Sequence, residues 1–392
     1  MKKILFVDNN LKIGGIQKAL VNLLNEIADE YEITLALFTD KGEYRKQLPK
    51  NINIVYVGGK LKILGLNQSE ARQEGTLCAL SRGACALFSK EFGNAMPIHL
   101  TVGHKKYFSQ YDYGISFMQM APKKQFFGGT NEFLLNCVEA KRKIGFIHGD
   151  FRQYGGDVEY AGKQYRRMDR IAACSQGCAE ALLSVLPDLM GKVFTVRNCS
   201  PYDEIRLLAD HDPPVYKDDE INLITVARLS EEKRIDRALM AAAYCIENGV
   251  RLHYHIVGDG PERARLEQMA EQRNIAHCVT FYGNQENPYR FMKNADLFLL
   301  TSCHEAAPMV FDEARCLHLP VLTTETTSTD EMIVRQHAGR VCENSESGIQ
   351  NSLLELLRNP EQIRHMKAEL RAQVCGNGPA LDQFRRLLDF EE

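Results

Sequence analysis

The fold is decided by residues 296–313, which read DLFLLTSCHEAAPMVFDE. The first six residues form a short apolar run, which predicts a strand, and a longer helical pattern follows them. A helix is expected to begin near Pro308, because proline suits the first helical turn, where its missing N–H costs nothing. Short apolar strands that alternate with helices in this order are typical of a parallel sheet flanked by helices.

The same alternation continues on both sides of this stretch. Strands are expected in the second half at 221–227, 252–257, 279–282 and 320–323, and in the first half at 3–8, 33–38, 52–57, 113–118, 143–148, 170–174 and 193–196. Between residues 200 and 220 the chain becomes polar, acidic and proline-bearing, which indicates a connection between two domains. The region 60–107 is helical in composition but too weakly periodic for its elements to be placed.

The expected fold class is α/β, with two Rossmann-like doubly wound domains that face each other across a cleft. The first domain is expected at residues 1–199, and a last helix at about 378–392 is expected to pack back on it. The second domain is expected at residues 200–377. Ligands bind such sheets at the carboxyl ends of the strands, so the candidate site residues are those that follow a strand.

Length and composition agree with this organisation. A chain of 392 residues, 44% of them hydrophobic, is long enough for two domains that each bury a core. The net charge of -3 does not resemble that of a nucleic-acid-binding protein, but residues 1–200 carry 27 basic and 19 acidic side chains, and the remainder carries 21 and 32. The 12 cysteines are scattered, which favours a reducing cytoplasm. No apolar run approaches the ~18 residues of a membrane span, so any membrane contact is expected to be peripheral.

The loop and helix after residue 301 have the features of an anion site. The free amides of Met309 and Val310 are expected at the helix start, where a phosphate binds readily. Glu305 lies in the loop and Glu313 about one turn into the helix. Carboxylates beside an anion site are explained if they accept hydrogen bonds from neutral hydroxyls of the same ligand, such as a sugar and a ribose that flank a diphosphate. The alternative is two ordinary glutamates at a helix start, which the helix dipole favours.

A second pair of candidates follows the strand at 221–227. Ser230 is expected to cap a helix, which would place Lys233 in its first turn, where a cation is unfavourable unless an anion is bound nearby. Arg228 at the strand end and Lys233 five residues later can converge on one diphosphate. The alternative is that both are solvated basic side chains.

The first domain offers weaker signals. Gly14 and Gly15 follow the strand at 3–8 and allow the backbone to approach a ligand before a helix begins. His148 ends the strand at 143–148, on the side of the sheet where sites form, although a single histidine is more often a structural residue.

Together these residues resemble glycosyltransferase family 4, whose members have the GT-B fold, use nucleotide-sugar donors and retain the anomeric configuration. The resemblance extends over nearly the whole chain and rests on Gly14-Gly15, His148, 170–175, Asn198, 226–229, Lys233, 256–261 and the E-x7-E element Glu305/Glu313. The chain departs from the family pattern at Ala306 and Ala227, where glycine is common. Alanine fills either place unless its φ is positive.

The resemblance implies a role for each residue. Arg228 and Lys233 hold the donor diphosphate, Glu305 contacts the donor sugar, Glu313 contacts the ribose, and His148 contacts the transferred sugar. No metal and no further cofactor is expected, since the nucleotide sugar is a substrate. The expected partners are that donor, with a UDP-sugar favoured, and a saccharide or lipid-linked acceptor.

Other classes of protein share some of these sequence features. A dinucleotide oxidoreductase is disfavoured, because Gly258-Asp259-Gly260 lacks the third glycine of its fingerprint. A metal-dependent transferase would need an Asp-x-Asp at a strand end, and Asp210-His211-Asp212 lies in the polar connection instead. A sugar-nucleotide epimerase, a phosphorylase of the same architecture, and a non-catalytic glycan-binding partner subunit stay open.

A final expectation concerns the acceptor and the location of the protein. The excess of basic side chains in residues 1–200 includes the pairs Lys105-Lys106 and Lys123-Lys124 and the clusters 141–143 and 166–167. A positive surface attracts anionic lipid or phosphorylated acceptors. The expected location is therefore the cytoplasm, with peripheral contact at the inner face of the membrane, and the expected role is in polysaccharide or glycoconjugate synthesis. The alternative is that these clusters are scattered, solvated side chains.

Overall fold

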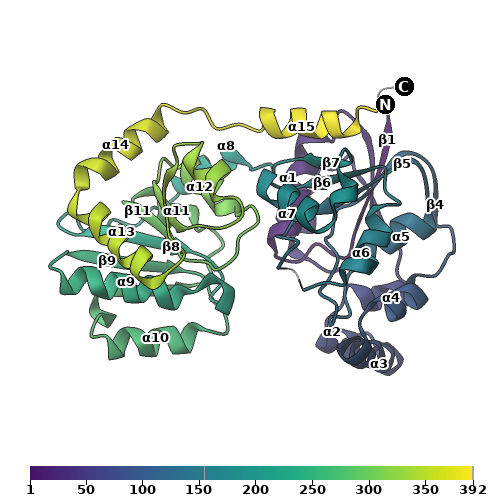
Figure 1. Ribbon diagram of the computed structural model, residues 1–392, viewed down its shortest axis with the longest axis horizontal. Coiled ribbons are helices and arrows are strands. Elements are labelled where there is room, and N and C mark those ends of the chain that lie inside the picture. Colours follow the sequence, from purple (N-terminus) through teal and green to yellow (C-terminus); the bar gives the residue numbers. More distant parts are fainter. Residues whose placement is uncertain (154, 391–392) are drawn as a thin grey trace. The chain divides into compact units, whose positions relative to one another are not determined.

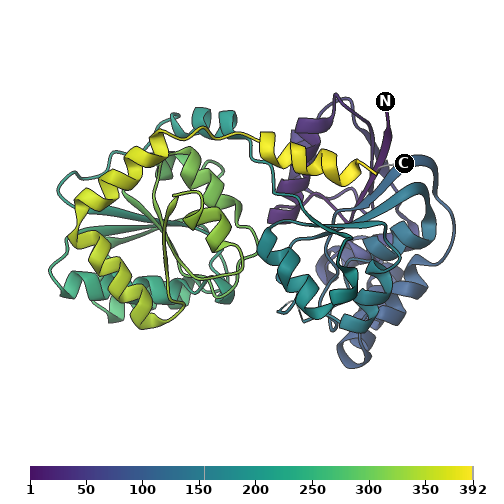
Figure 2. The same cartoon turned by 45° about the horizontal axis from the view of Figure 1, so that its top comes forward.

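The computed structural model describes residues 1–153 and 155–390, which fold into two compact units. The first unit contains Met1–Cys199 and the segment that returns to it from Asn377, and the second contains Ser200–Gly376. Figure 1 and Figure 2 show a sheet with helices on both faces in each unit. No helix in the described part of the chain is long and apolar enough to cross a membrane.

Among its described residues, the first unit forms a seven-stranded parallel sheet in the order β3-β2-β1-β4-β5-β6-β7. Its strands are β1 Lys3–Asp8, β2 Glu32–Leu37, β3 Asn53–Tyr56, β4 Phe108–Ser116, β5 Val138–Ile147, β6 Arg170–Ala173 and β7 Val193–Thr195. Its α-helices are α1 Gly15–Ile27, α2 Gln68–Gln73, α3 Thr76–Phe92, α4 Ala95–Val102, α5 Thr130–Cys137, α6 Val158–Tyr165, α7 Gln176–Val185 and α15 Gly378–Leu388. Short 3₁₀ turns occur at Glu43–Gln47, Gly59–Leu64 and Pro187–Leu189.

Residues 200–376, all of which the structure describes, form a six-stranded parallel sheet in the order β10-β9-β8-β11-β12-β13. Its strands are β8 Ile221–Val226, β9 Leu252–Val257, β10 Val279–Gly283, β11 Leu297–Leu300, β12 Val321–Thr324 and β13 Gly339–Cys342. Its α-helices are α8 Tyr202–Ala209, α9 Ile235–Glu247, α10 Arg263–Gln272, α11 Tyr289–Lys293, α12 Met309–Cys316, α13 Glu346–Arg358 and α14 Pro360–Arg371. Glu231–Lys233 and Ala276–Cys278 are 3₁₀ turns, and Asp330–Val334 is a π-helical turn.

Strand β11 shows why the sheet of the second unit is covered on both faces. Leu297 and Leu299 belong to one buried apolar cluster, with residues of α9, α10 and α13. Phe298 and Leu300, which point to the other face, belong to a second cluster, with residues of α8, α11 and α12. Successive strand residues point to opposite faces, so an uninterrupted apolar run needs helices on both. This confirms the predicted fold class of two Rossmann-like α/β units.

Each sheet reverses its strand order at one point. In the first unit β1 lies between β2 and β4, and in the second β8 lies between β9 and β11. In each sheet the connections that follow the two neighbouring strands at this point, β1 and β4 or β8 and β11, run to opposite faces of the sheet. This opens a crevice beyond their carboxyl ends, which is called the switch point of the sheet. The residues that follow β1, β4, β8 and β11 are therefore the ones positioned to bind a ligand.

The last helix packs on the first unit. Phe384 of α15 is fully buried, and its ring stacks on that of Phe6 with centroids 6.4 Å apart. Arg385 makes an ion pair with Glu30 at 2.7 Å. The chain thus enters the second unit after residue 199 and returns from it to complete the core of the first.

Candidate functional site

The residues that follow β8 and β11 meet at the switch point of the second unit. Lys233 Nζ lies 2.5 Å from Glu305 Oε1, and Ser302 Oγ donates to the same oxygen at 2.6 Å. The Glu305 side chain is only 8% exposed and that of Lys233 is 23% exposed. A largely buried carboxylate therefore has both a cation and a hydroxyl on one oxygen.

The local backbone around Lys233 differs from the predicted one. Glu231–Lys233 forms a 3₁₀ turn, and Arg234 then adopts a left-handed conformation with φ 48° and ψ 44°, so helix α9 begins only at Ile235. Ser230 does not cap a helix, because its hydroxyl donates to Glu232 Oε1 at 2.6 Å. Lys233 consequently lies before the helix rather than in its first turn.

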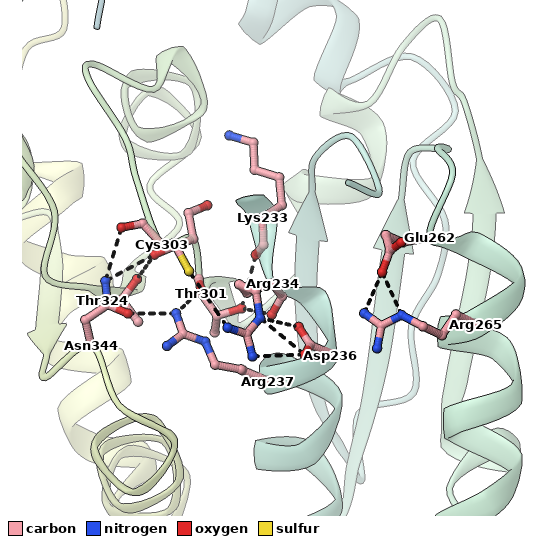
Figure 3. Close-up of polar contacts among 11 residues, drawn as sticks. Lys233, Arg234, Asp236, Arg237, Glu262, Arg265, Thr301, Cys303, Thr324 and Asn344 are labelled. Carbon is pink, nitrogen blue, oxygen red and sulfur yellow. Dashed lines mark hydrogen bonds and ion pairs between the residues drawn. The ribbon is translucent and has the colours of Figure 1, made fainter. Parts of the chain in front are cut away.

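Polar contacts tie the loop after β8 to the loop after β11. Thr301 Oγ1 donates to the carbonyl of Arg234 at 2.7 Å, and Arg237 donates to the carbonyl of Thr301 at 2.6 Å. The same guanidinium nitrogen also donates to Asn344 Oδ1 at 2.7 Å. Figure 3 shows these contacts and the Lys233 side chain, which points away from them. The two loops are therefore held together by contacts that do not involve the Lys233 amine, which pairs with Glu305.

Arg228 lies in a loop whose position depends on two glycines. Leu229 N donates to the carbonyl of Asp259 at 3.0 Å, so the loops after β8 and β9 run against each other. A Cβ atom at Gly258 would lie 1.9 Å from the carbonyl oxygen of Ala227, and one at Gly260 would lie 2.2 Å from that of Leu229. The glycines are needed for this close approach. The Arg228 side chain is exposed and has no hydrogen-bond or ion-pair partner within residues 1–153 and 155–390.

Helix α12 begins at Met309, directly after Pro308. The amide of Phe311 donates to the carbonyl of Pro308 at 3.1 Å, whereas those of Met309 and Val310 have no acceptor in the described part of the chain. Glu313 is buried within the helix, and its Oε1 accepts from the Tyr289 hydroxyl at 3.4 Å. The helix start thus offers two free donors, which is suitable for an anion.

Two alanines occupy positions where the family commonly has glycine. Neither Ala227 nor Ala306 is among the described residues that have a positive φ. Alanine therefore adopts the backbone conformation at both positions without strain.

In the first unit, Gly14 and Gly15 stand at the start of α1. Gly14 is extended, with a φ of -178°, which any residue adopts, and the amide of Lys18 donates to its carbonyl at 2.9 Å. A Cβ atom at Gly15 would have no atom within 4 Å. At Gly14, by contrast, a Cβ atom would lie 2.7 Å from Gln17 Oε1, so open space at the helix start is found at Gly15 alone of this pair, and neither glycine has an unusual backbone conformation.

His148 follows β5 and is held in one orientation. Its Nε2 lies 2.8 Å from the carbonyl oxygen of Phe117, and its ring centroid lies 4.7 Å from that of Phe117 and 5.7 Å from that of Phe146. Because a carbonyl only accepts, Nε2 carries the proton and Nδ1 is an acceptor. Burial lowers the pKa of His148 to about 4. The imidazole is therefore neutral near pH 7.

Two residues that the sequence analysis did not select belong to these sites. Ser302, the second residue after β11, is fully buried and positions Glu305. Asp8, the last residue of β1, is fully buried, and burial raises its pKa to about 7. Its Oδ1 accepts from the amide of Asn9 at 2.6 Å, and its Oδ2 has no partner among the residues described. A polar residue at the end of an apolar strand beside the switch point was the available signal.

The described residues do not form a metal site. Within residues 1–153 and 155–390 there is no group of three or more His, Cys, Asp or Glu side chains that could hold a metal ion. The Asp-x-Asp of the connection is engaged elsewhere, since Asp210 makes an ion pair with Lys293 at 2.7 Å and Asp212 makes one with Arg290 at 3.0 Å. These aspartates therefore stabilise the connection rather than face the switch point.

The sequence of the second unit is similar to a known family. Residues 209–387 match the family described as "Glycosyl transferases group 1". The chain is 29% identical over 164 residues to the N-acetyl-alpha-D-glucosaminyl L-malate synthase of Bacillus anthracis, and 28% identical over 163 residues to the amylovoran biosynthesis glycosyltransferase AmsK of Erwinia amylovora. The matched regions cover 42% and 39% of this chain and 41% and 40% of those relatives, so the chain matches about two fifths of their length.

Solved structures share the architecture of the whole chain. TarM of S. aureus, solved with UDP and alpha-GlcNAc-glycerol, has a TM-score of 0.70 at 13% identity. The comparison covers 100% of this chain and 100% of that one. HepE of Anabaena, solved with UDP, has a TM-score of 0.64 at 16% identity, with 98% of this chain and 96% of that one covered. Together the comparisons show the GT-B fold for the chain and a second unit similar in sequence to the group 1 glycosyl transferases.

Proposed function

We propose that the protein is a retaining glycosyltransferase of family 4 that moves a sugar from a nucleotide-diphosphate sugar to a saccharide or lipid-linked saccharide. A UDP-sugar is the favoured donor. The observation that carries the proposal is the contact between Lys233 and Glu305 at the switch point of the second unit, four residues before the free amides of α12. A cation, a carboxylate and two amides suit a ligand that has both a diphosphate and sugar hydroxyls.

The cations stabilise the leaving group in this mechanism. As the bond between the sugar and the diphosphate breaks, negative charge grows on the phosphate oxygens. Arg228, Lys233 and the amides of Met309 and Val310 stabilise this charge from positions set before the reaction. Lys233 keeps two further N–H donors beside the one that faces Glu305, so it can contact a phosphate without leaving the carboxylate.

Glu305, Glu313 and His148 orient the donor. Glu305 accepts hydrogen bonds from the sugar hydroxyls, and Glu313 contacts the ribose. His148 contacts the transferred sugar through Nδ1, which accepts a hydrogen bond from a sugar hydroxyl. With a pKa of about 4, His148 is not protonated near pH 7 and so does not act as the acid that protonates the leaving group.

Transfer proceeds with retention of the anomeric configuration. The acceptor hydroxyl attacks from the face that the diphosphate leaves, and the departing phosphate takes its proton. The name of one relative, the GDP-mannose-dependent alpha-(1-6)-phosphatidylinositol dimannoside mannosyltransferase of Mycobacterium tuberculosis, specifies an α-linkage, which supports retention where the donor is α-linked. NMR of the product linkage tests it, because an inverted anomer from an α-linked donor would contradict the proposal.

The first experiment is a panel of nucleotide sugars incubated with the purified protein, with and without an acceptor. Release of the nucleoside diphosphate distinguishes a transferase from an epimerase, which releases none, and from a binding subunit, which changes nothing. A phosphorylase would consume a glycoside and inorganic phosphate instead.

The proposal includes transfer without a divalent metal, with Arg228 and Lys233 neutralising the diphosphate. We expect Lys233→Ala to reduce turnover by about 100-fold, because it removes one fixed charge from the leaving group, whereas EDTA should leave the rate unchanged. Lys217→Ala is the matched control, since Lys217 lies in the connection and its side chain is 75% exposed. Loss of activity in EDTA, with Lys233→Ala close to normal, would assign the role to a metal.

The acceptor is proposed to be anionic or membrane-borne, which would place the protein at the inner membrane face. Of the basic clusters, Lys141 makes an ion pair with Asp112, Arg166 makes one with Asp188 and Lys123 makes one with Asp157. Lys105, Lys106 and Lys124 are exposed. The apolar side chains on α3 and α4 support the same proposal. Those that face solvent are Leu77, Leu80, Leu87, Phe92, Met96 and Leu100, which are 48–79% exposed.

Exposed leucines on a helix near lysines bind anionic bilayers by apolar insertion and by charge. We expect binding to phosphatidylglycerol vesicles that falls as salt rises, and that weakens in the double variant Leu80→Ser/Leu87→Ser. Leu207→Ser, at an equally exposed leucine of the second unit, is the control. Equal binding of all three proteins, or no binding to vesicles, would favour a soluble acceptor.

A further inference from the structure

A surface cavity of about 370 Å³ lies on the second unit, at the opposite edge of the sheet from Lys233. Ala295 lines it just before β11 begins, and Leu317 and His318 line it just before β12 begins. In a parallel sheet the amino ends of all strands lie at one edge and the carboxyl ends at the other, so this cavity is separate from the candidate donor site. Its volume is within the range of small-molecule sites.

Four cationic side chains converge on this cavity from three helices, α8, α11 and α14, which Figure 1 labels. They are Arg206, Lys293, Lys367 and Arg371. Asp210 is the one acidic side chain in the lining. The wall of the cavity is therefore predominantly basic.

The cations differ in how far they are neutralised. Lys293 makes an ion pair with Asp210 at 2.7 Å, and Lys367 makes one with Asp296 at 2.9 Å. Arg206 is paired with Asp203 at 2.8 Å, an aspartate that does not line the cavity. Arg371 has no ion-pair or hydrogen-bond partner for its guanidinium in the described part of the chain. One full positive charge in the lining of the cavity thus stays unpaired.

The pKa of His318 is affected by the positive charges around the cavity. Its backbone is left-handed, with a φ of 56°, and its amide donates to the carbonyl of Arg315 at 3.0 Å. The pKa of His318 is lowered first by burial and then by the positive charges of Arg371, Arg206 and Lys293. These cations therefore act on one point inside the cavity, where a bound anion would oppose them.

We propose that this cavity binds a phosphorylated small molecule without an aromatic base, such as a sugar phosphate. Phosphate oxygens match the unpaired Arg371 guanidinium, which donates two parallel hydrogen bonds, and the amines of Lys293 and Lys367 act as point charges. The lining contains no Phe or Tyr on which a nucleobase would stack. The carboxylate of Asp210 offers an acceptor to a hydroxyl of the same ligand. This site does not depend on the proposed glycosyl transfer.

The experiment follows the imidazole of His318 by NMR in the full chain, with His318→Gln to assign its signal. Glucose 6-phosphate, and more weakly inorganic phosphate, should bind and raise the pKa of His318, whereas glucose should not. Arg371→Ala should weaken the binding of glucose 6-phosphate by about tenfold or more, since a hydrogen bond to a charged group is lost. Arg364→Ala is the control, because Arg364 lies on the same helix, pairs with Glu361 and does not line the cavity.

Several outcomes would overturn the proposal. These are an unchanged His318 at millimolar glucose 6-phosphate, equal binding of glucose, and full binding by Arg371→Ala. Phosphatidylglycerol vesicles separate the two sources of phosphate. If they shift His318 and glucose 6-phosphate does not, the cavity recognises a lipid headgroup instead of a soluble phosphate.

Discussion

Replacing Gly260 with alanine is expected to displace the loop that carries Arg228. A Cβ atom at Gly260 would lie 2.2 Å from the carbonyl oxygen of Leu229 and 2.7 Å from its carbonyl carbon. The three nearest atoms all belong to the backbone of Leu229, so no side chain can rotate to relieve the contact. The separation must increase from 2.2 Å to at least the 3.4 Å of ordinary contact, which moves the two loops apart by about 1.2 Å.

This displacement affects both stability and turnover. The hydrogen bonds from Leu229 N to Asp259 O and from Glu262 N to Leu229 O, at 3.0 and 3.1 Å, join the same two loops and would lengthen. Overpacking of this kind costs about 1–3 kcal/mol. For a unit of this size that free energy lowers the melting temperature by roughly 2–12 °C. A shift of about 1 Å in a group that binds the reacting ligand can also reduce turnover by about 100-fold.

Gly376→Ala is the matched control. It adds the same methyl group in the same unit, where no atom lies within 4 Å and φ is not positive. Calorimetry of both variants and initial rates of nucleoside diphosphate release measure the two effects. If Gly260→Ala melts within about 1 °C of Gly376→Ala and releases the diphosphate at the same rate, the contact between the loops does not position Arg228.

Three further changes test other parts of the structure. Lys233→Met and Glu305→Gln should be non-additive in a double-mutant cycle of unfolding free energies, with a coupling of about 0.5–3 kcal/mol, because the two side chains share one contact; strict additivity would contradict the ion pair. Asp8, whose pKa is raised to about 7, should make the wild type lose stability as pH rises from about 4 to 7. His148, whose pKa is lowered to about 4, should make it lose stability as pH falls from about 6.5 to 4. Asp8→Asn and His148→Gln should therefore change the pH dependence of the melting temperature in opposite directions, and parallel curves would argue against this assignment. Phe384→Ala should destabilise the first unit by about 3–5 kcal/mol, since it empties a fully buried position, and an unchanged melting temperature would mean that α15 does not hold the core.

The sequence allowed the fold class and the strands of each sheet to be predicted, because short apolar runs identify strands in a parallel sheet without any knowledge of their partners. The contact between Lys233 and Glu305 follows from the same logic. These residues are 72 positions apart, but each follows a strand, and β8 and β11 are neighbours. Parallel strands bring their carboxyl ends to one edge, so the side chains that follow them meet.

Other features could not be predicted, for two physical reasons. The start of α9 at Ile235 depends on the left-handed backbone of Arg234, a conformation that arginine adopts rarely. Ser230 is a common helix-capping residue, so the sequence predicted an earlier start. Helices α2, α3 and α4 were not placed in the region 60–107, because the outward face of α3 carries leucines. A helix that is apolar toward both core and solvent has little periodicity to detect.

The pair Gly258 and Gly260 shows why a short motif needs its surroundings. Taken alone, a strand followed by Gly-x-Gly and a helix is compatible with a loop that cradles a dinucleotide phosphate. In the structure the space that each missing side chain leaves is filled by the backbone of the neighbouring loop, at Ala227 and Leu229. These glycines therefore set the position of the loop that carries Arg228, which stands between those two residues, and in the proposed function they act on the donor through it. Glycine is required both in a phosphate-binding loop and where two backbones pack closely. Only the atoms that pack against Gly258 and Gly260 distinguish the two cases.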